Sequence, residues 1–136
     1  ASEDEMAIPA LKMAAKLSDE GELDLRLGNA YLNLAMYGDC VKSVKAGIKK
    51  GKIKSPDNAQ ISLGMCLYNE KEYLEAIDAF KAASKTKRSQ RISGQWIAVI
   101  ESDIARNKQI ELAENAAKKQ ADDLAKRRAQ AQAARI

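Results

Sequence analysis

Residues 63–83 read LGMCLYNEKEYLEAIDAFKAA, and the order of small and bulky side chains in them predicts two packed helices. Gly64 lies on the first of these helices, and Ala76, Phe80 and Ala83 share one face of the second, because they are four and three residues apart. A glycine opposite a phenylalanine lets two helices approach closely while the ring fills the space between them. The segment therefore predicts a helical hairpin.

The same offsets occur once more, 36 residues earlier in the chain. Here Gly28 takes the place of the first glycine, and Cys40, Val44 and Gly47 take the places of the small, bulky and small residues. Repeated helical hairpins bury their faces only against neighbouring repeats, and they typically form extended binding surfaces. The repeat therefore favours a scaffold that binds over a site that catalyses a reaction.

The first helix of the chain, predicted over residues 5–17, reproduces only half of this unit. Ala7, Leu11 and Ala14 have the offsets of the second helix of a hairpin, and no first helix precedes them. Its apolar stripe consists of Met6, Ala10, Met13, Ala14 and Leu17. We expect this face to meet repeats of a longer chain or a second copy of the protein, and we expect Pro9 near the first turn, where a missing N–H is tolerated.

Further helices are predicted over residues 23–37, 40–50, 59–69 and 73–85. Gly38-Asp39 is expected to break the first pair of helices, with Asp39 as an N-cap, and residues 70–72 form the turn of the second pair. From Ile92 a strong apolar face indicates a helix that caps the last hairpin, with Trp96 as its anchor. The following residues form one helix with it, or a second helix after a joint near residues 106–108.

These elements predict an all-α chain with a helical-repeat (α-solenoid) architecture. Its parts are a second helix of a truncated repeat (1–22), two hairpins (23–54 and 55–87) and a C-terminal helix or pair of helices (88–136) that caps the array or projects from it. The last part is mostly Ala, Lys, Gln and Arg beyond residue 113, so it is helix-prone but has little to bury.

Composition limits the classes of function. The chain has 136 residues, 4% aromatic residues, a mean hydropathy of −0.44 and no histidine. The sequence holds no metal-ligand cluster, phosphate-binding glycine loop or nucleophile motif, so we expect no catalytic residue, metal or cofactor. No segment is predicted to span a membrane, and the chain does not open with a signal peptide. Cys40 and Cys66 fall at buried small-residue positions, which favours free thiols, with a disulfide as the alternative.

Positive charge recurs at the end of each hairpin. The two clusters are Lys42, Lys45, Lys49, Lys50, Lys52 and Lys54, and then Lys85, Lys87, Arg88 and Arg91. Cations at a helix C-terminus complement its dipole, which is the simpler interpretation. The alternative is a basic edge that, together with Lys126, Arg127 and Arg128, binds an anionic surface or nucleic acid without sequence specificity.

Residues 6–87 resemble the tetratricopeptide repeat (TPR), a unit of about 34 residues built from two antiparallel helices. The match departs from the family at Asp24 and Gln60, where a bulky residue is common. Four stretches resemble, more narrowly, the C-terminal region of TPR proteins associated with TonB systems of Gram-negative bacteria: residues 14–23, 47–51, 58–60 and 95–97. That resemblance implies a periplasmic accessory of a TonB, ExbB and ExbD type complex that powers the uptake of iron chelates, with components of that system as partners.

TPR proteins receive peptides on the face formed by the first helices of their hairpins. On this chain the helical geometry predicts that eight side chains point toward that groove. They are Leu25, Asn29, Leu32, Asn33, Ile61, Met65, Tyr68 and Asn69. The chain's own C-terminal helix is an alternative occupant. Leu25 stands where the family's carboxylate clamp needs a lysine, which excludes that mode of binding. Self-assembly through the N-terminal half-repeat or the C-terminal helix is a third class of function.

Overall fold

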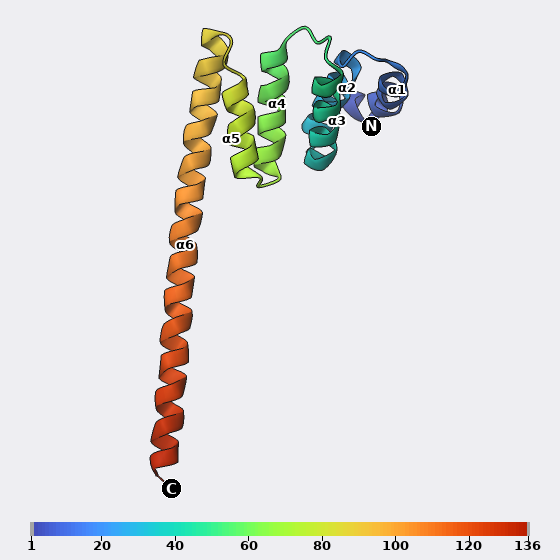
Figure 1. Ribbon diagram of the computed structural model, residues 1–136. Helices are drawn as coiled ribbons and strands as arrows, with labels where there is room; N and C mark the ends of the chain where they lie inside the picture. Colours follow the sequence, from blue (N-terminus) through green and yellow to red (C-terminus); the bar gives the residue numbers. More distant parts are fainter. Residues whose placement is uncertain (1, 136) are drawn as a thin grey trace. The chain divides into compact units, whose positions relative to one another are not determined.

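The computed structural model describes residues 2–135, and in this part of the chain six helices and no strands occur (Figure 1). The helices are α1 (Glu3–Leu17), α2 (Glu22–Asn33), α3 (Tyr37–Lys50), α4 (Pro56–Asn69), α5 (Tyr73–Ala82) and α6 (Lys87–Ala134). The predicted all-α class is confirmed. The chain divides into two compact units, residues 1–100 and residues 101–136.

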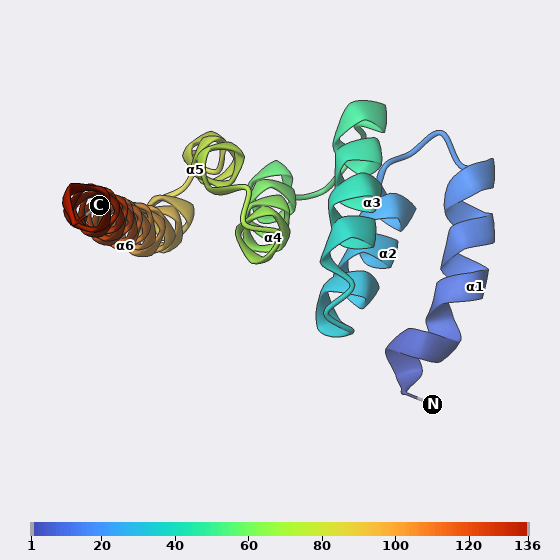
Figure 2. The same ribbon diagram turned by 90° about the horizontal axis from the view of Figure 1, so that it is seen from below.

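In the first unit, helices that follow one another pack side by side. α2 and α3 form one antiparallel pair and α4 and α5 form another, while α1 packs on α2 and α3 packs on α4 (Figures 1 and 2). Figure 2 looks along α4 and α5 but shows α2 and α3 from the side, so the second pair is turned relative to the first. Each pair buries one face against its neighbour, as a stack of hairpins requires.

The predicted small and bulky positions lie at the contacts within each pair. A methyl group added at Gly28 would lie 2.5 Å from Val44 Cγ2, and one added at Gly64 would lie 2.7 Å from the Phe80 ring. Both distances are too short for any side chain larger than hydrogen. Val44 and Phe80 are fully buried, as are Ala76 and Ala83. The repeated spacing of glycine, alanine and bulky side chains therefore marks the core.

The turn of the first pair differs from the prediction. α2 ends at Asn33 and α3 begins at Tyr37, so the expected break at Gly38-Asp39 is wrong: both residues lie in the first turn of α3. Met36, not Asp39, holds the N-cap position, and Ala35 makes the turn with φ +57°. Backbone hydrogen bonds close this turn, including Met36 N to Tyr31 O at 2.8 Å, so no capping side chain is needed. The turn predicted at residues 70–72 is confirmed, with Lys71 at φ +63°.

Other helix ends also move. α4 begins at Pro56, three residues earlier than predicted, because Pro fits the first helical position and Ser55 Oγ accepts a hydrogen bond from Asn58 N at 3.4 Å. α5 ends at Ala82 rather than residue 85. α6 continues without the joint considered near residues 106–108.

Three residues of the predicted apolar stripe of α1 stay exposed although α1 packs on α2. Met6, Met13 and Leu17 are 70%, 63% and 82% exposed, whereas Ala15 is buried. Lys50 Nζ donates a hydrogen bond of 2.6 Å to Ala15 O and so ties the end of α1 to α3. Pro9 lies beyond the first turn, because α1 begins at Glu3.

The second unit consists of a single stretch of α6, so its own residues offer no second element for packing. Ile110, Leu112 and Leu124 are about half exposed (49%, 55% and 49%). No helix in the described part of the chain combines the length and apolar character needed to cross a bilayer.

Candidate functional site

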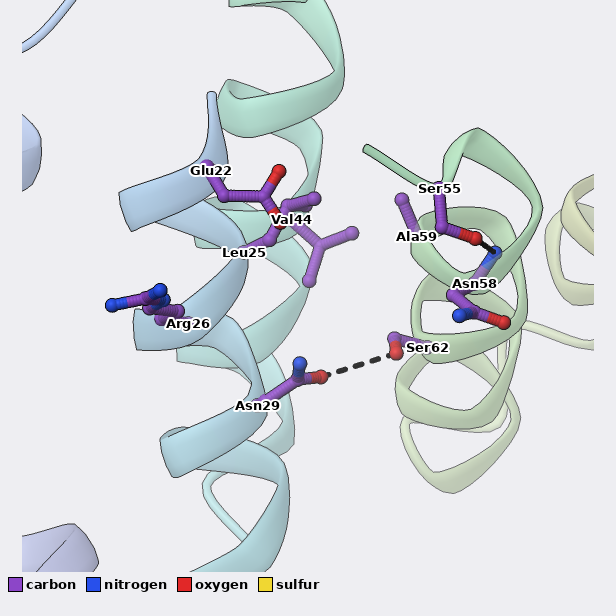
Figure 3. Close-up of a pocket in the computed structure, with 9 residues that line it drawn as sticks. All are labelled: Glu22, Leu25, Arg26, Asn29, Val44, Ser55, Asn58, Ala59 and Ser62. Carbon is purple, nitrogen blue, oxygen red and sulfur yellow. Dashed lines mark hydrogen bonds between the residues drawn. The ribbon is translucent and has the colours of Figure 1, made fainter. Parts of the chain in front are cut away.

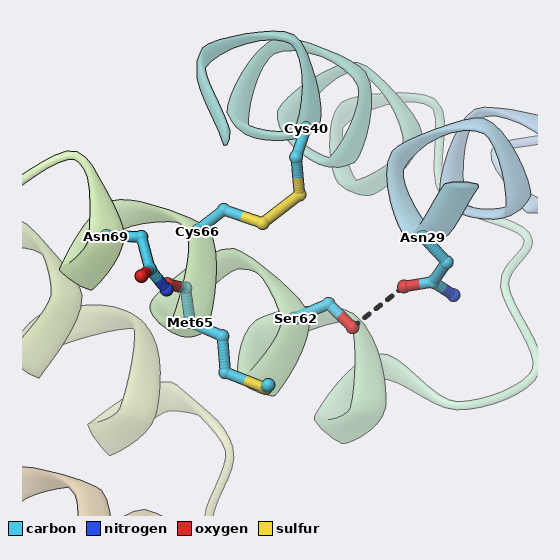
Figure 4. Close-up of a disulfide and its surroundings, with 6 residues drawn as sticks. All are labelled: Asn29, Cys40, Ser62, Met65, Cys66 and Asn69. Atoms are coloured by element: carbon cyan, nitrogen blue, oxygen red, sulfur yellow. Dashed lines mark hydrogen bonds between the residues drawn. A yellow bond between two sulfur atoms is a disulfide. The ribbon is translucent and has the colours of Figure 1, made fainter. Parts of the chain in front are cut away.

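A disulfide joins the two hairpins. Cys40 in the first turn of α3 and Cys66 on α4 are bonded to each other, with Cα atoms 6.2 Å apart (Figure 4). Both residues are fully buried. The preferred prediction of free thiols is therefore wrong and the alternative is correct. Helical spacing identified both positions as buried, but it did not reveal that the packing of α3 on α4 brings the two sulfur atoms together.

A polar cleft of about 160 Å³ lies between α2, α3 and α4. Asn29 and Ser62 face each other across it, and Ser62 Oγ donates a hydrogen bond of 3.1 Å to Asn29 Oδ1 (Figure 3). Leu25 and Val44 are buried beneath them. Two of the eight predicted groove residues, Leu25 and Asn29, thus line one cleft. It brings together donors and acceptors suited to a peptide backbone.

The other predicted residues on these helices are partly committed to contacts within the chain. Asn33 Nδ2 donates to Asp4 Oδ1 at 3.4 Å, and Asn69 Nδ2 donates to Met65 O at 2.8 Å. The Asn33 and Asn69 amides thus each have a partner within the chain. The aliphatic side chains of the predicted set on α2 and α4 that line neither cleft, Leu32, Ile61 and Met65, are half-buried.

Sequence reasoning missed several residues that line the polar cleft: Glu22, Arg26, Ser55, Asn58, Ala59 and Ser62. In Figure 3 the Arg26 side chain points away from α4, so this cation does not face Ser62 across the cleft. Ser62 and Asn58 lie one helical turn apart on α4. The helical periodicity of α4 was sufficient to predict that both residues lie on one side of the helix. It was not sufficient to predict that this side faces α2.

At the other end of α4, aromatic rings form a cluster. The Trp96 indole stacks on Phe80, with centroids 5.4 Å apart and planes at 7°, and Tyr68 stands edge-on to Trp96 at 5.5 Å. Tyr68 also contacts Tyr73, at 5.8 Å. The predicted anchoring role of Trp96 is confirmed by these contacts. They also mean that the first turns of α6 touch one predicted groove residue, Tyr68.

An open cleft of about 410 Å³ adjoins this cluster, lined by Tyr68, Gln95, Trp96 and Val99. Val99 is 47% exposed. Neither Gln95 nor Val99 was among the predicted binding residues. Both residues lie close to Trp96 in the sequence, one residue before it and three residues after it, and this proximity could have identified them as its neighbours on α6.

The two basic clusters have different electrostatic surroundings. In the first, Lys45 pairs with Glu75 and Lys50 with Asp24, each at 2.8 Å, and Lys52 pairs with Asp19 at 3.4 Å. Lys85, Lys87, Arg88 and Arg91 form no ion pair within the described residues. Three of the six lysines in the first cluster therefore have a carboxylate partner, whereas none of the four cations at the start of α6 has one within the described residues.

Two buried carboxylates contact lysines of the basic clusters. Asp24 pairs with Lys50. Asp24 is one of the two residues that depart from the TPR pattern, and its charge is balanced by this lysine. Asp57 Oδ2 accepts a hydrogen bond of 3.0 Å from Lys85 N, which fixes the loop between α5 and α6. Thr86 Oγ1 in turn accepts from Ser89 N at 3.0 Å and caps α6.

Comparison with known protein families and with curated proteins gives no match for this chain. Within residues 2–135, no group of three or more His, Cys, Asp or Glu side chains is arranged to hold a metal ion.

Proposed function

We propose that this chain is a non-enzymatic scaffold of TPR-type hairpins that binds a protein or peptide partner. The observation that carries the proposal is the repeated close contact of Gly28 with Val44 and of Gly64 with Phe80, at equivalent offsets in successive helix pairs. This repetition supports a solenoid in which α2 and α4 occupy corresponding positions. Their shared surface is the binding face we propose.

The chemistry of that surface favours a peptide. Asn29 and Ser62 present hydrogen-bonding groups at one end, and the Tyr68 and Trp96 rings present apolar area at the other. Extended peptides need both, because their backbone groups require partners and their side chains require pockets. Three lysines of the first basic cluster already have carboxylate partners, which leaves less of that cluster's charge for the alternative, nonspecific attraction of anionic surfaces.

The particular role we propose is that of a periplasmic accessory of a TonB-type transport complex. The resemblance of residues 14–23 and 95–97 motivates this role, and the Cys40–Cys66 disulfide supports an oxidising compartment.

Crosslinking in the native envelope, followed by identification of the captured proteins, tests the role. We expect TonB-system components to be captured, and we expect Tyr68→Ala to reduce their recovery several-fold. Tyr37→Ala is the matched control, since Tyr37 is a half-buried tyrosine on α3 that lines neither cleft. Recovery of ribosomes and nucleic acid alone, or equal recovery with both variants, would contradict the proposal.

The proposed compartment has its own test. Cells are lysed in acid, and free thiols are labelled with a maleimide of high mass. We expect no mobility shift unless a reductant is added first, because both cysteines are bonded. Labelling of both cysteines without reductant would place the protein in a reducing compartment.

A further inference from the structure

The start of α6 carries positive charge where a helix ordinarily disfavours it. Lys87, Arg88 and Arg91 are exposed, Lys85 precedes them, and the first turn of α6 contains no acidic residue. The N-terminus of a helix is the positive end of its dipole, so cations there repel it as well as one another. Asp57, which accepts a hydrogen bond from the backbone N–H of Lys85, is buried, and none of these four cations forms an ion pair within the described residues. This cluster thus lacks a counter-charge among the described residues.

The cations continue directly into the aromatic cleft. Arg88, Arg91, Gln95 and Val99 follow one another at intervals of three or four residues, so they lie along one side of α6. Gln95 and Val99 line the cleft with Tyr68 and Trp96. One surface of the first unit therefore has two arginines at one end and an open apolar cleft at the other.

The apolar end is fixed in shape. Trp96 is held by its stack on Phe80, which is itself fully buried, and Tyr68 is held between Trp96 and Tyr73. A rigid aromatic wall next to a half-exposed valine can receive one bulky apolar side chain with little loss of side-chain entropy.

We infer that this surface, defined by Arg88, Arg91, Gln95, Val99, Trp96 and Tyr68, binds an acidic peptide segment that carries one bulky apolar side chain. The inference rests on the proposed peptide-binding function and names the class of peptide. Charge complementarity selects the occupant, because acidic side chains would supply the counter-charge that Arg88 and Arg91 lack.

The same surface is less suited to nucleic acid. Binding of single strands relies on open aromatic faces on which successive bases stack. Here Phe80 covers one face of the only tryptophan, and Tyr68 stands edge-on to it. A peptide side chain needs only the open side of the cleft.

Trp96 is the only tryptophan of the chain, so its fluorescence reports directly on the cleft. The full chain is titrated with a synthetic peptide in which glutamates flank one central phenylalanine. We expect a saturable change in emission, and we expect the double variant Arg88→Gln/Arg91→Gln to bind about tenfold more weakly, as loss of two partly exposed charge pairs predicts. Lys12→Gln/Lys16→Gln removes the same charge from α1 and should bind like the unaltered chain. Circular dichroism checks that both variants fold.

Three outcomes would overturn the inference. Equal affinity for a peptide with glutamines in place of the glutamates would refute the acidic class while leaving peptide binding intact. Equal affinity for a peptide with alanine in place of phenylalanine, or for vesicles with anionic headgroups, would show that charge alone is recognised. Absence of binding by every peptide would also overturn it, and the envelope crosslinking then decides separately whether the proposed function stands.

Discussion

At the scale of single residues, the presence or absence of one methyl group decides how closely two helices approach. Two of the helical glycines, Gly64 and Gly94, are in opposite situations. A Cβ atom at Gly64 would lie 2.7 Å from the buried Phe80 ring, whereas one at Gly94 on α6 would meet nothing within 4 Å. The two positions therefore separate the steric role of glycine from its cost to helix stability.

We predict that Gly64→Ala destabilises the fold by about 1–2 kcal/mol, because the overpacking penalty exceeds the gain in helix propensity. Gly94→Ala is the matched control and should stabilise by about 0.5–1 kcal/mol, since it gains propensity without a clash. Urea unfolding followed by circular dichroism measures both. Stabilisation by both substitutions would contradict the close packing of α4 on α5.

At the scale of elements, a lysine links three helices. Lys50 on α3 contacts Asp24 on α2 and Ala15 O at the end of α1. The Asp24 side chain is only 10% exposed, so loss of its partner would leave a mostly buried charge. α1 therefore owes part of its attachment to a hydrogen bond from a lysine of α3 that is also ion-paired with α2.

We predict that Lys50→Met lowers the free energy of unfolding by about 2 kcal/mol, because breaking a largely buried pair leaves the Asp24 carboxylate uncompensated. Lys52→Met is the control. Its pair with Asp19 is 64% and 86% exposed, and such pairs contribute less than about 0.5 kcal/mol. Thermal unfolding of both variants provides the comparison, and equal melting temperatures would refute the role of Lys50.

The two turns within the helix pairs show when a local sequence pattern is sufficient to predict where a helix ends. The turn at residues 70–72 was predictable because a run of charged residues interrupts two apolar helices. The turn before α3 was not, because Gly38 and Asp39 are typical turn residues that nevertheless lie inside a helix. Ala35 makes that turn with φ +57°, closed by backbone hydrogen bonds alone. The side chains in the sequence therefore give no pattern from which this turn could be predicted.

At the scale of the whole molecule, the disulfide is the covalent link between the two hairpins. Cys40 and Cys66 are 26 residues apart, and the bond closes a loop that includes all of the chain between α3 and α4. Such a link lowers the entropy of the unfolded chain, and the effect grows with the length of the closed loop.

We predict that Cys40→Ala/Cys66→Ala loses about 3 kcal/mol of stability, as the entropy of a loop of this length suggests. Urea unfolding of the variant is compared with that of the unaltered chain with and without reductant. The reduced chain should unfold at a urea concentration close to that of the variant. An unchanged midpoint in both would mean that the bond contributes nothing to the stability of the stacked hairpins.

The sequence by itself determined the helices and their internal contacts. The contact between Gly64 and Phe80 was predictable from the sequence, because helical periodicity and side-chain volume determine which residues meet within one hairpin. Only the tertiary structure decided the bond between Cys40 and Cys66, the contact of Tyr68 with Trp96 and the ion pair of Lys50. The disulfide depends on how one hairpin turns against the next, the contact of Tyr68 with Trp96 on how α6 packs on the second hairpin, and the ion pair on where the end of α3 meets the start of α2. That geometry is set jointly by loops and by packed faces, which no local pattern of residues specifies.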